Sequence, residues 1–431
     1  MPLFWIPPEV AFCFVAIVDR ALNLSSLSSS DCYETIIVGA GIAGLACAQR
    51  LAEQGKSDFL LIGEKLGGRI PSSSDGQVNY GAFYLRSDYE HFLKFAGIKR
   101  RIHVSDVLFA QEGKYKSIFS IVSWKQYPKL IRWMLFLRKF QRHSLLFRQR
   151  SVTMSQKKAI ELDPWLHQLY SEPAEALIER LRLEELAGNC FDQLVMATSF
   201  QRRSEITAGY YAASCLPLIQ PTYEFEFFPE RMIESCFENI QKGSVTRVSP
   251  INTEGYCWEV LNDHGNRYQC RNLVMATPIS VSRSLIEIPG ETNPAAAAYM
   301  VHVRGILKSD YATGAIHIFP CDSEDLVIVH ELNGTSFLYS RRATPVLETY
   351  FHNYEVIARK HWDPAFFLGN CIIEAERDNN LYLIGDHSFC SVEDALITGL
   401  FAANRIARRC SERNESSQSD YREPLDPVLA G

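Results

Sequence analysis

The stretch TIIVGAGIAGL at residues 35–45 decides how this chain of 431 residues folds. Its first four residues are all β-branched, which is the composition of a buried parallel strand. The Ala-rich segment 45–54, closed by Gly55, has helical propensity, and a second apolar strand follows at 59–62. The sequence therefore predicts a strand–helix–strand unit of the length that binds a dinucleotide.

Three glycines in this unit have separate physical tasks. Gly39 permits a tight turn, Gly41 lets the backbone approach a pyrophosphate, and Gly44 lets the helix pack closely on the strand. Ile42 and Ala43 begin the helix, whose N-terminal N–H groups would face the phosphates. All five residues are predicted to bind the cofactor.

An acidic residue is expected at the end of the second strand, where it would hold a ribose hydroxyl. Glu64 is the candidate. Two alternatives remain: Gly63 occupies that position, or Glu64 is a solvated loop residue.

A second group of glycines follows this strand at once, in LGGR at 66–69, DG at 75–76 and YGA at 80–82. An extended flavin dinucleotide lays its pyrophosphate and ring along such a loop, whereas a nicotinamide dehydrogenase has no need of it. Arg69 offers a planar donor fork to phosphate. The predicted cofactor contacts in this loop are Gly67, Gly68, Arg69, Tyr80, Gly81 and Ala82.

The C-terminal part of the chain repeats the pattern of a strand that ends in glycine and opens a helix. An apolar strand is predicted at 381–384 and ends in Gly385 and Asp386. Ser391, with Asp394 three residues on, has capping-box form at the start of a helix rich in small residues. A helix N-terminus here would stabilise negative charge on a reduced ring system.

These blocks resemble the flavin amine oxidase superfamily, which includes amine oxidases, protoporphyrinogen oxidases and phytoene-type desaturases. The motifs that carry the resemblance are GAGIAGL, GGR and the NYGAF run at 79–83. A third block, from a strand signal at 243–248 to ATP at 276–278, also matches. The resemblance implies bound FAD, with Asp386 at the ribityl–phosphate region and the Val392–Glu393 backbone at the flavin pyrimidine. It also implies that Val245 meets the adenine, with Ala276 beside the cofactor.

The resemblance predicts an α/β fold: a glutathione-reductase-type, FAD-binding Rossmann-like domain with an inserted α+β substrate domain. The predicted segments are an N-terminal extension at 1–30; an FAD domain at 31–105, 230–290 and 365–412; a substrate domain at 106–229 and 291–364; and a flexible tail at 413–431.

The chain departs from the amine oxidases at the substrate side. Those enzymes place a Tyr or Trp just before the last helix, where this chain has Ser391, and no Tyr or Trp stands between His387 and Leu396. A flavin-facing lysine is also expected, and Lys308, in poor register, is the only candidate. His387 is a second weak catalytic candidate, as a proton carrier; its alternative is a hydrogen-bonding role. Amine oxidation therefore ranks low.

Charge is unevenly distributed along the chain. The net charge of −6 gives no reason to expect a nucleic-acid partner. Yet residues 114–159 hold twelve Lys and Arg and no acid. On a helical wheel the segment 124–150 gathers basic residues opposite an apolar side, which is typical of a helix on an anionic membrane. The alternative is that this apolar side packs on its own domain. The predicted apolar side is Leu130, Trp133, Met134, Leu137 and Phe140; the basic side is Lys125, Lys129, Arg132, Lys139 and Arg142.

Twelve cysteines without a CxxC pair favour reduced thiols in the cytoplasm and give no metal-ligand spacing. The leading hypothesis is an FAD-dependent oxidoreductase that passes hydride from a lipophilic substrate to flavin N5, with peripheral membrane contact as an addition. The alternatives are a catalytically silent FAD-bound binding or assembly protein, and a flavin amine oxidase. The oligomeric state does not follow from the sequence.

Overall fold

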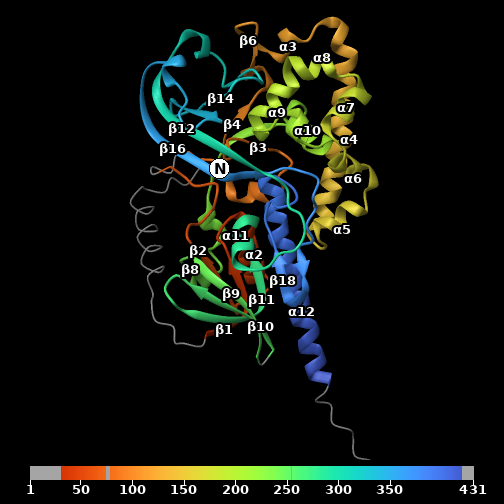
Figure 1. Ribbon diagram of the computed structural model, residues 1–431, viewed down its shortest axis with the longest axis vertical. Coiled ribbons are helices and arrows are strands. Elements are labelled where there is room, and N and C mark those ends of the chain that lie inside the picture. Colours follow the sequence, from red (N-terminus) through yellow and green to blue (C-terminus); the bar gives the residue numbers. More distant parts are fainter. Residues whose placement is uncertain (1–30, 74–77, 254, 420–431) are drawn as a thin grey trace, which may run out of the picture.

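The computed structural model describes residues 31–73, 78–253 and 255–419. The predicted N-terminal extension at 1–30, the DG pair at 75–76 and the end of the tail from 420 lie outside the described residues. Two layered units lie one above the other in Figure 1, with the cofactor domain below and the substrate domain above.

The predicted strand–helix–strand unit is present in the cofactor domain. It consists of β1 (Asp31–Val38), α2 (Ile42–Glu53) and β2 (Phe59–Gly63). β1 pairs in parallel with both β2 and β11, and the sheet runs β17-β18-β11-β1-β2-β8. The other strands are β8 (Ile240–Lys242), β9 (Val245–Thr253), β10 (Tyr256–Asn262), β11 (Arg267–Met275), β17 (Glu376–Arg377) and β18 (Leu381–Leu383).

Helix α12 (Val392–Ser419) packs directly against α2 beside this sheet. A Cβ at Gly399 would lie only 2.1 Å from the carbonyl oxygen of Ala43, so glycine is what allows the close approach. Helix α11 (Ile279–Leu285) follows β11. The close contact of α2 and α12 brings the first and last predicted cofactor segments to one end of the sheet.

The substrate domain is built on a seven-stranded sheet, ordered β16-β12-β15-β14-β13-β5-β6. Its strands are β5 (Val107–Gln111), β6 (Lys114–Ser117), β12 (Ala295–Leu307), β13 (Ile316–Ile318), β14 (Asp325–His330), β15 (Thr335–Ser340) and β16 (Phe351–Phe367). A three-stranded sheet of β3 (Leu85–Arg86), β7 (Thr222–Phe227) and β4 (Ala96–Ile102) is separate from it.

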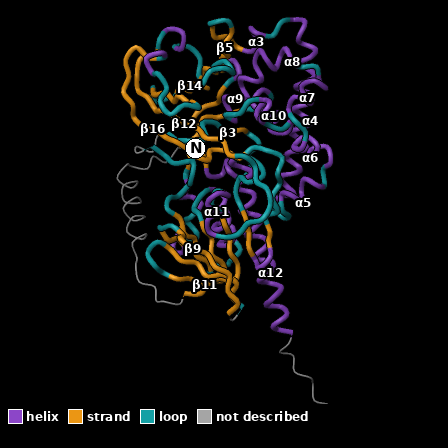
Figure 2. Tube along the Cα trace, in the orientation of Figure 1, coloured by secondary structure: helices purple, strands orange, loops and turns teal. Residues whose placement is uncertain are grey.

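The helices of the substrate domain gather at one side of its sheet, as Figure 2 shows. They are α3 (Ile118–Ile121), α4 (Tyr127–Ser151), α5 (Gln156–Glu161), α6 (Pro164–Ser171), α7 (Ala174–Leu181), α8 (Glu184–Leu186), a π-helical turn (Ala187–Phe191), α9 (Asp192–Ser199) and α10 (Ala208–Cys215). Helix α7 ends before α8 begins because Arg182 has a left-handed φ of 54°.

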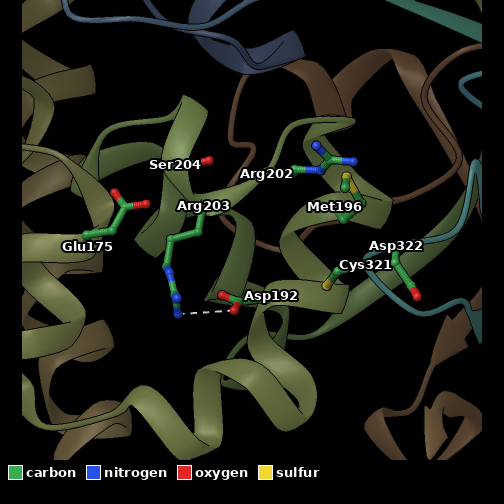
Figure 3. Close-up of a pocket in the computed structure, with 8 residues that line it drawn as sticks. All are labelled: Glu175, Asp192, Met196, Arg202, Arg203, Ser204, Cys321 and Asp322. Atoms are coloured by element: carbon green, nitrogen blue, oxygen red, sulfur yellow. Dashed lines mark ion pairs between the residues drawn. The ribbon is translucent and has the colours of Figure 1, made fainter.

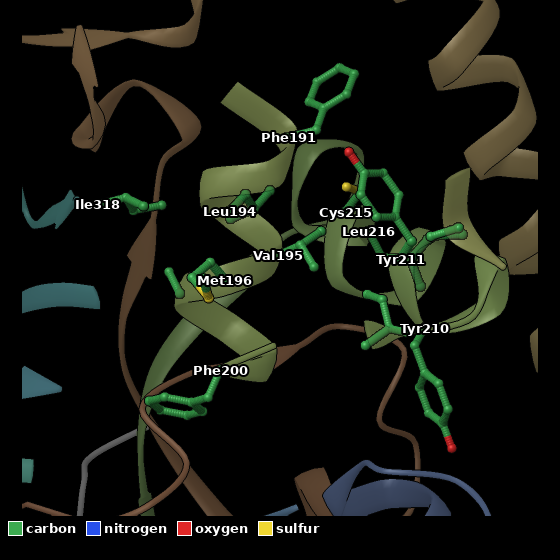
Figure 4. Close-up of a cluster of buried hydrophobic side chains, with 14 of the residues drawn as sticks. Phe191, Leu194, Val195, Met196, Phe200, Tyr210, Tyr211, Cys215, Leu216 and Ile318 are labelled. Atoms are coloured by element: carbon green, nitrogen blue, oxygen red, sulfur yellow. The ribbon is translucent and has the colours of Figure 1, made fainter. Parts of the chain in front are cut away.

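The core of this domain lies between α4, α9 and α10. On α4 the buried side chains include Trp133, Leu137 and Phe140, so these members of the predicted apolar side pack inside the domain. Tyr210 and Tyr211 leave α10 in opposite directions (Figure 4). The Tyr210 hydroxyl donates to a backbone carbonyl of the segment before α12, at Ser388 (2.6 Å), so the core reaches the cofactor domain.

A buried ion network also joins the two domains. Arg148, in the last turn of α4, donates to both carboxylate oxygens of Asp394 on α12 at 2.8 and 2.9 Å, and to Asp88 at 3.2 Å. Arg86 completes the network with a bond of 2.9 Å to Asp88. All four residues are less than a tenth exposed. The C-terminal end of α4 is therefore fixed in the interior.

Candidate cofactor and active site

The nucleotide turn between β1 and α2 has no spare room at two of its three glycines. Gly39 has φ +111°, and a Cβ there would lie 2.8 Å from the carbonyl oxygen of Ala276. A Cβ at Gly44 would lie 2.0 Å from the carbonyl oxygen of Gly39. Gly41 differs, because a Cβ there would meet no atom within 4 Å. Open space at this one glycine is what a phosphate group needs in order to approach the backbone.

The second glycine loop lies directly over this turn. Gly67 pairs with Gly41 in a parallel bridge and donates its N–H to the carbonyl of Ala40 at 2.9 Å. A Cβ at Gly68 would lie 2.9 Å from the Cα of Gly41. Both loop glycines have positive φ, so the two glycine-rich segments approach each other through bare backbone.

Arg69 connects this loop to the C-terminal part of the chain. Its guanidinium forms an ion pair with Asp386 at 2.6 Å and donates to the carbonyl oxygen of Ala365 at 3.0 Å. Burial opposes the charge of Arg69, but Asp386 outweighs this and raises its pKa. Two predicted cofactor residues more than 300 positions apart thus meet, next to Gly385, which has φ +131°. Their contact with a cofactor stays a prediction.

The N-terminus of α12 is capped as the sequence predicts. The Ser391 hydroxyl accepts a hydrogen bond from the Asp394 N–H at 2.9 Å. The carboxylate of Glu393 accepts from the backbone N–H groups of His91 and Phe92, both at 2.9 Å. Burial raises the pKa of Glu393 to about 7. The Glu393 side chain therefore binds backbone N–H groups of its own chain. The predicted contact with a flavin then falls to the Val392–Glu393 backbone.

Two of the remaining predicted contacts, Ala276 and Glu64, follow the C-terminal ends of parallel strands, whereas Val245 begins an antiparallel strand. Ala276 follows β11 and donates its N–H to the carbonyl of Val38 at 2.8 Å, beneath the nucleotide turn. Glu64 follows β2 and is exposed. Val245 begins β9, two residues beyond Gly243, whose N–H donates to the carbonyl of Gly63 at 3.2 Å. The roles of Glu64 and Val245 at ribose and adenine stay predictions.

Tyr80, Gly81 and Ala82 carry the glycine loop to the substrate sheet. The Tyr80 hydroxyl shares a hydrogen bond of 3.2 Å with Nδ1 of His302 on β12, so its polar end faces the substrate domain. The Tyr339 hydroxyl, from β15, donates to the carbonyl of Gly81 at 3.2 Å. A Cβ at Gly81 would lie 2.4 Å from the carbonyl oxygen of Arg69. This loop is therefore clamped between the two domains.

Lys308 and Lys360, two lysines in or next to the substrate sheet, lie in different places. Lys308 follows the far end of β12 and donates to the backbone carbonyl of Glu348, another substrate-domain residue. Lys360 lies on β16 opposite Met300, and its Nζ is 5.0 Å from the centre of the Tyr80 ring. Sequence reasoning missed Lys360, because only the pairing of β12 with β16 brings it next to the glycine loop.

The segment 387–390 lies between the ion pair of Asp386 and the N-terminus of α12. His387 is buried, and neither ring nitrogen has a hydrogen-bond partner among the described residues. Burial lowers its pKa, which favours the neutral ring. Burial likewise raises the pKa of the Cys390 thiol. Buried polar atoms normally have hydrogen-bond partners, so these ring nitrogens could bind a polar group of a ligand. His387 therefore stays a candidate site residue.

Aromatic side chains of the substrate domain surround the far side of the loop. The Tyr339 ring lies 5.4 Å from Phe83 and 5.9 Å from Phe200, and Phe200 stacks on Phe366 at 5.4 Å. Because the Tyr339 hydroxyl binds Gly81, this aromatic wall adjoins the predicted flavin loop. Phe200 and Tyr339 are buried in the domain core, whereas Phe83 and Phe366 are half-buried and keep some exposed apolar surface.

A pocket of about 360 Å³ lies in the substrate domain, where Arg203 forms an ion pair of 3.1 Å with Asp192 (Figure 3). Arg202, Glu175 and Asp322 also line it. Its lining residues include none of the glycine segments. Among the described residues, no group of three His, Cys, Asp or Glu could hold a metal ion.

Comparison with known proteins identifies the fold. Residues 37–97 match the family model described as an NAD(P)-binding Rossmann-like domain. A double mutant of putrescine oxidase is similar over 88% of this chain and 100% of its own, with a TM-score of 0.66 and 14% identity. The chain has the fold of the flavin amine oxidases. The predicted fold class is therefore confirmed.

Two further solved structures with this flavin amine oxidase fold differ in chemistry. Cyclohexylamine oxidase from Brevibacterium oxydans has a TM-score of 0.62 and 14% identity, over 89% of this chain and 99% of its own. A CLA-producing fatty acid isomerase from P. acnes has a TM-score of 0.64 and 14% identity, over 88% and 99%. No curated protein sequence matches the chain. The shared fold thus leaves the substrate open.

A buried carboxyl pair lies where the three-stranded sheet meets the substrate sheet. Glu224 on β7 forms an ion pair of 2.6 Å with Arg100 on β4. Burial, a hydrogen bond with Glu224 and the charge of Glu224 together raise the pKa of Glu331 to about 9. At neutral pH the Glu331 carboxyl group is therefore protonated.

This pair predicts a pH dependence of stability. Because the pKa of Glu331 is higher in the folded state than its ordinary value of 4.5, its contribution is complete below pH 4.5 and is lost as the pH rises through about 9. We expect Glu331→Gln, which keeps a neutral donor, to raise the free energy of unfolding at pH 9 by at least about 1 kcal/mol. Urea denaturation at pH 6 and pH 9 measures this.

The matched control is Glu355→Gln on β16, because the Glu355 carboxylate is exposed and pairs with exposed Arg304. Its effect should stay within about 0.5 kcal/mol at both pH values. Equal pH dependence in the wild type and in Glu331→Gln would show that Glu331 does not hold the proton.

Proposed function

We propose that this protein is an FAD-dependent oxidoreductase that removes a hydride from a lipophilic organic substrate. The observation that carries the proposal is the meeting of Arg69 with Asp386 beside a nucleotide turn that is open at Gly41. Glycine backbone, a guanidinium and a carboxylate are the groups that a dinucleotide pyrophosphate and its sugar hydroxyls require.

The residues around this junction fit FAD. The open backbone at Gly41 and the α12 N-terminus offer N–H groups, and the buried His387 ring has unused nitrogens. When bound, the flavin would supply the hydride acceptor. The chain itself would bind and orient the cofactor, with the Gly81 loop held by the Tyr339 hydroxyl, and it needs no conspicuous acid–base pair.

The aromatic wall of Phe83, Phe200, Tyr339 and Phe366 supports a lipophilic substrate. Amine oxidation is the second candidate, supported by Lys360 near the Tyr80 ring. It ranks lower because the aromatic residue before α12, Phe389, already packs in the core against Phe147 and Tyr170. Phe389 is therefore not free to form an aromatic wall for an amine.

Absorption spectroscopy of the purified full-length protein tests the proposal. We expect an absorption band of oxidised flavin at about 450 nm. Under anaerobic conditions, lipophilic compounds should bleach this band and small amines should not. Bleaching by amines alone would favour the amine oxidase alternative. A yellow protein that no organic extract bleaches would favour a silent binding protein. A colourless protein that takes up no FAD would refute the proposal.

A further inference from the structure

Helix α4 exposes an apolar stripe on the side opposite its buried face. Trp124, in the turn just before the helix, is 76% exposed, and on the helix Tyr127 is 46%, Ile131 55% and Leu135 58% exposed. Residues 127, 131 and 135 are four positions apart and therefore share one face. We call Trp124, Tyr127, Ile131 and Leu135 the α4 stripe. A contiguous set of large exposed apolar side chains marks an interaction surface.

The α4 stripe differs from the apolar side that the helical wheel predicts. Trp133, Leu137 and Phe140 are fully buried in the substrate domain. The fold therefore uses one apolar face of α4 for its own core and leaves a second one at the surface. Packing within the described part of the chain does not cover this second face.

Basic side chains border the α4 stripe. The exposed ones are Lys125, Arg132, Arg138, Lys139 and Arg142. No acid occurs on the helix or its flanks between residues 114 and 159. On the neighbouring helix α8, Glu185 lies 4.0 Å from Lys129 and offsets that one charge. The border therefore keeps an excess of positive charge, complementary to an anionic surface.

We propose that the α4 stripe and its basic border dock this protein on an anionic membrane surface. Interfacial tryptophan and tyrosine with aliphatic side chains would enter the headgroup region, while the lysines and arginines contact lipid phosphates. No helix in the described part of the chain has the length and hydropathy to cross a bilayer, so the contact is peripheral. Docking through this surface does not depend on the proposed oxidoreductase activity.

Vesicle co-sedimentation of the flavin-loaded full-length protein tests the docking surface. The vesicles are phosphatidylcholine with about 30% phosphatidylserine, compared with phosphatidylcholine alone. We expect binding to the anionic vesicles that weakens as salt rises. Replacing Trp124, Ile131 and Leu135 together by Ser should lower the affinity at least tenfold. Reversing Arg132, Arg138 and Arg142 to Glu should lower it roughly a hundredfold, since each lost basic charge costs roughly fivefold.

The controls keep the same chemistry at other surfaces. Ile306 on β12 is 61% exposed, and Arg267 on β11 is an exposed arginine of the cofactor domain. We expect Ile306→Ser and Arg267→Glu to bind vesicles like the wild type. Flavin absorbance in each sample measures bound cofactor independently of vesicle binding. Loss of flavin and loss of vesicle binding can therefore be told apart.

Two outcomes would overturn the docking proposal. One is vesicle binding that the stripe and border substitutions leave unchanged. The other is a wild-type protein that ignores anionic vesicles but forms a dimer, which the triple Ser substitution converts to a monomer in sedimentation velocity. That result would assign the α4 stripe to a second copy of the chain.

Discussion

Gly41→Val should fold normally and lose its flavin. A Cβ at this position meets no protein atom within 4 Å, and the φ of −74° suits any residue. The valine would therefore occupy only the space through which a pyrophosphate reaches the backbone. We expect flavin content below about a tenth of the wild-type value, with an unchanged circular dichroism spectrum. Flavin absorbance per chain after gel filtration measures the loss.

Two other glycines separate loss of cofactor from loss of fold. Gly188, in the substrate domain, also has no atom within 4 Å of a Cβ and no positive φ, so Gly188→Val should keep its flavin. Gly44→Val should instead fail to fold, because its Cβ would overlap the carbonyl oxygen of Gly39. A soluble Gly41→Val protein that is fully loaded and yellow would contradict the assignment of this turn to the cofactor.

The nucleotide turn was predictable because its requirements are local. Gly39 and Gly44 are constrained by atoms of the neighbouring strand and turn, and such steric limits are visible in the spacing of glycines along the sequence. The capping of α12 by Ser391 is local in the same way, since donor and acceptor are three residues apart. These parts of the site therefore follow from the sequence alone.

The other half of the site depends on strand pairing over long distances. Lys360 and Tyr339 reach the Gly81 loop only through the order of β16, β12 and β15, which local spacing does not encode. The two faces of α4 show a related limit. Both Trp133 and Ile131 are apolar, and only the packing of the domain decides that the first is buried and the second is exposed.

Arg148→Met should destabilise the protein more than any surface substitution. Arg148 is only 7% exposed and holds Asp394 and Asp88, which are equally buried. Burial raises the pKa of Asp88, but the charges of Arg86 and Arg148 outweigh it and hold that pKa below its usual value. Methionine would keep the apolar stem and leave buried carboxylates without their partner. We expect the free energy of unfolding to fall by about 3–5 kcal/mol in urea denaturation at pH 7.

The pair of Arg180 with Glu172 is the control, because it is also bidentate but its guanidinium is 45% exposed. Arg180→Met should cost less than about 1 kcal/mol, since water screens the exposed guanidinium. The deficit of Arg148→Met comes from buried carboxylates that are left without a cation. Adding Asp394→Asn to Arg148→Met should recover part of the loss for the same reason. A deficit no larger than that of Arg180→Met would mean that the network does not hold the two domains together.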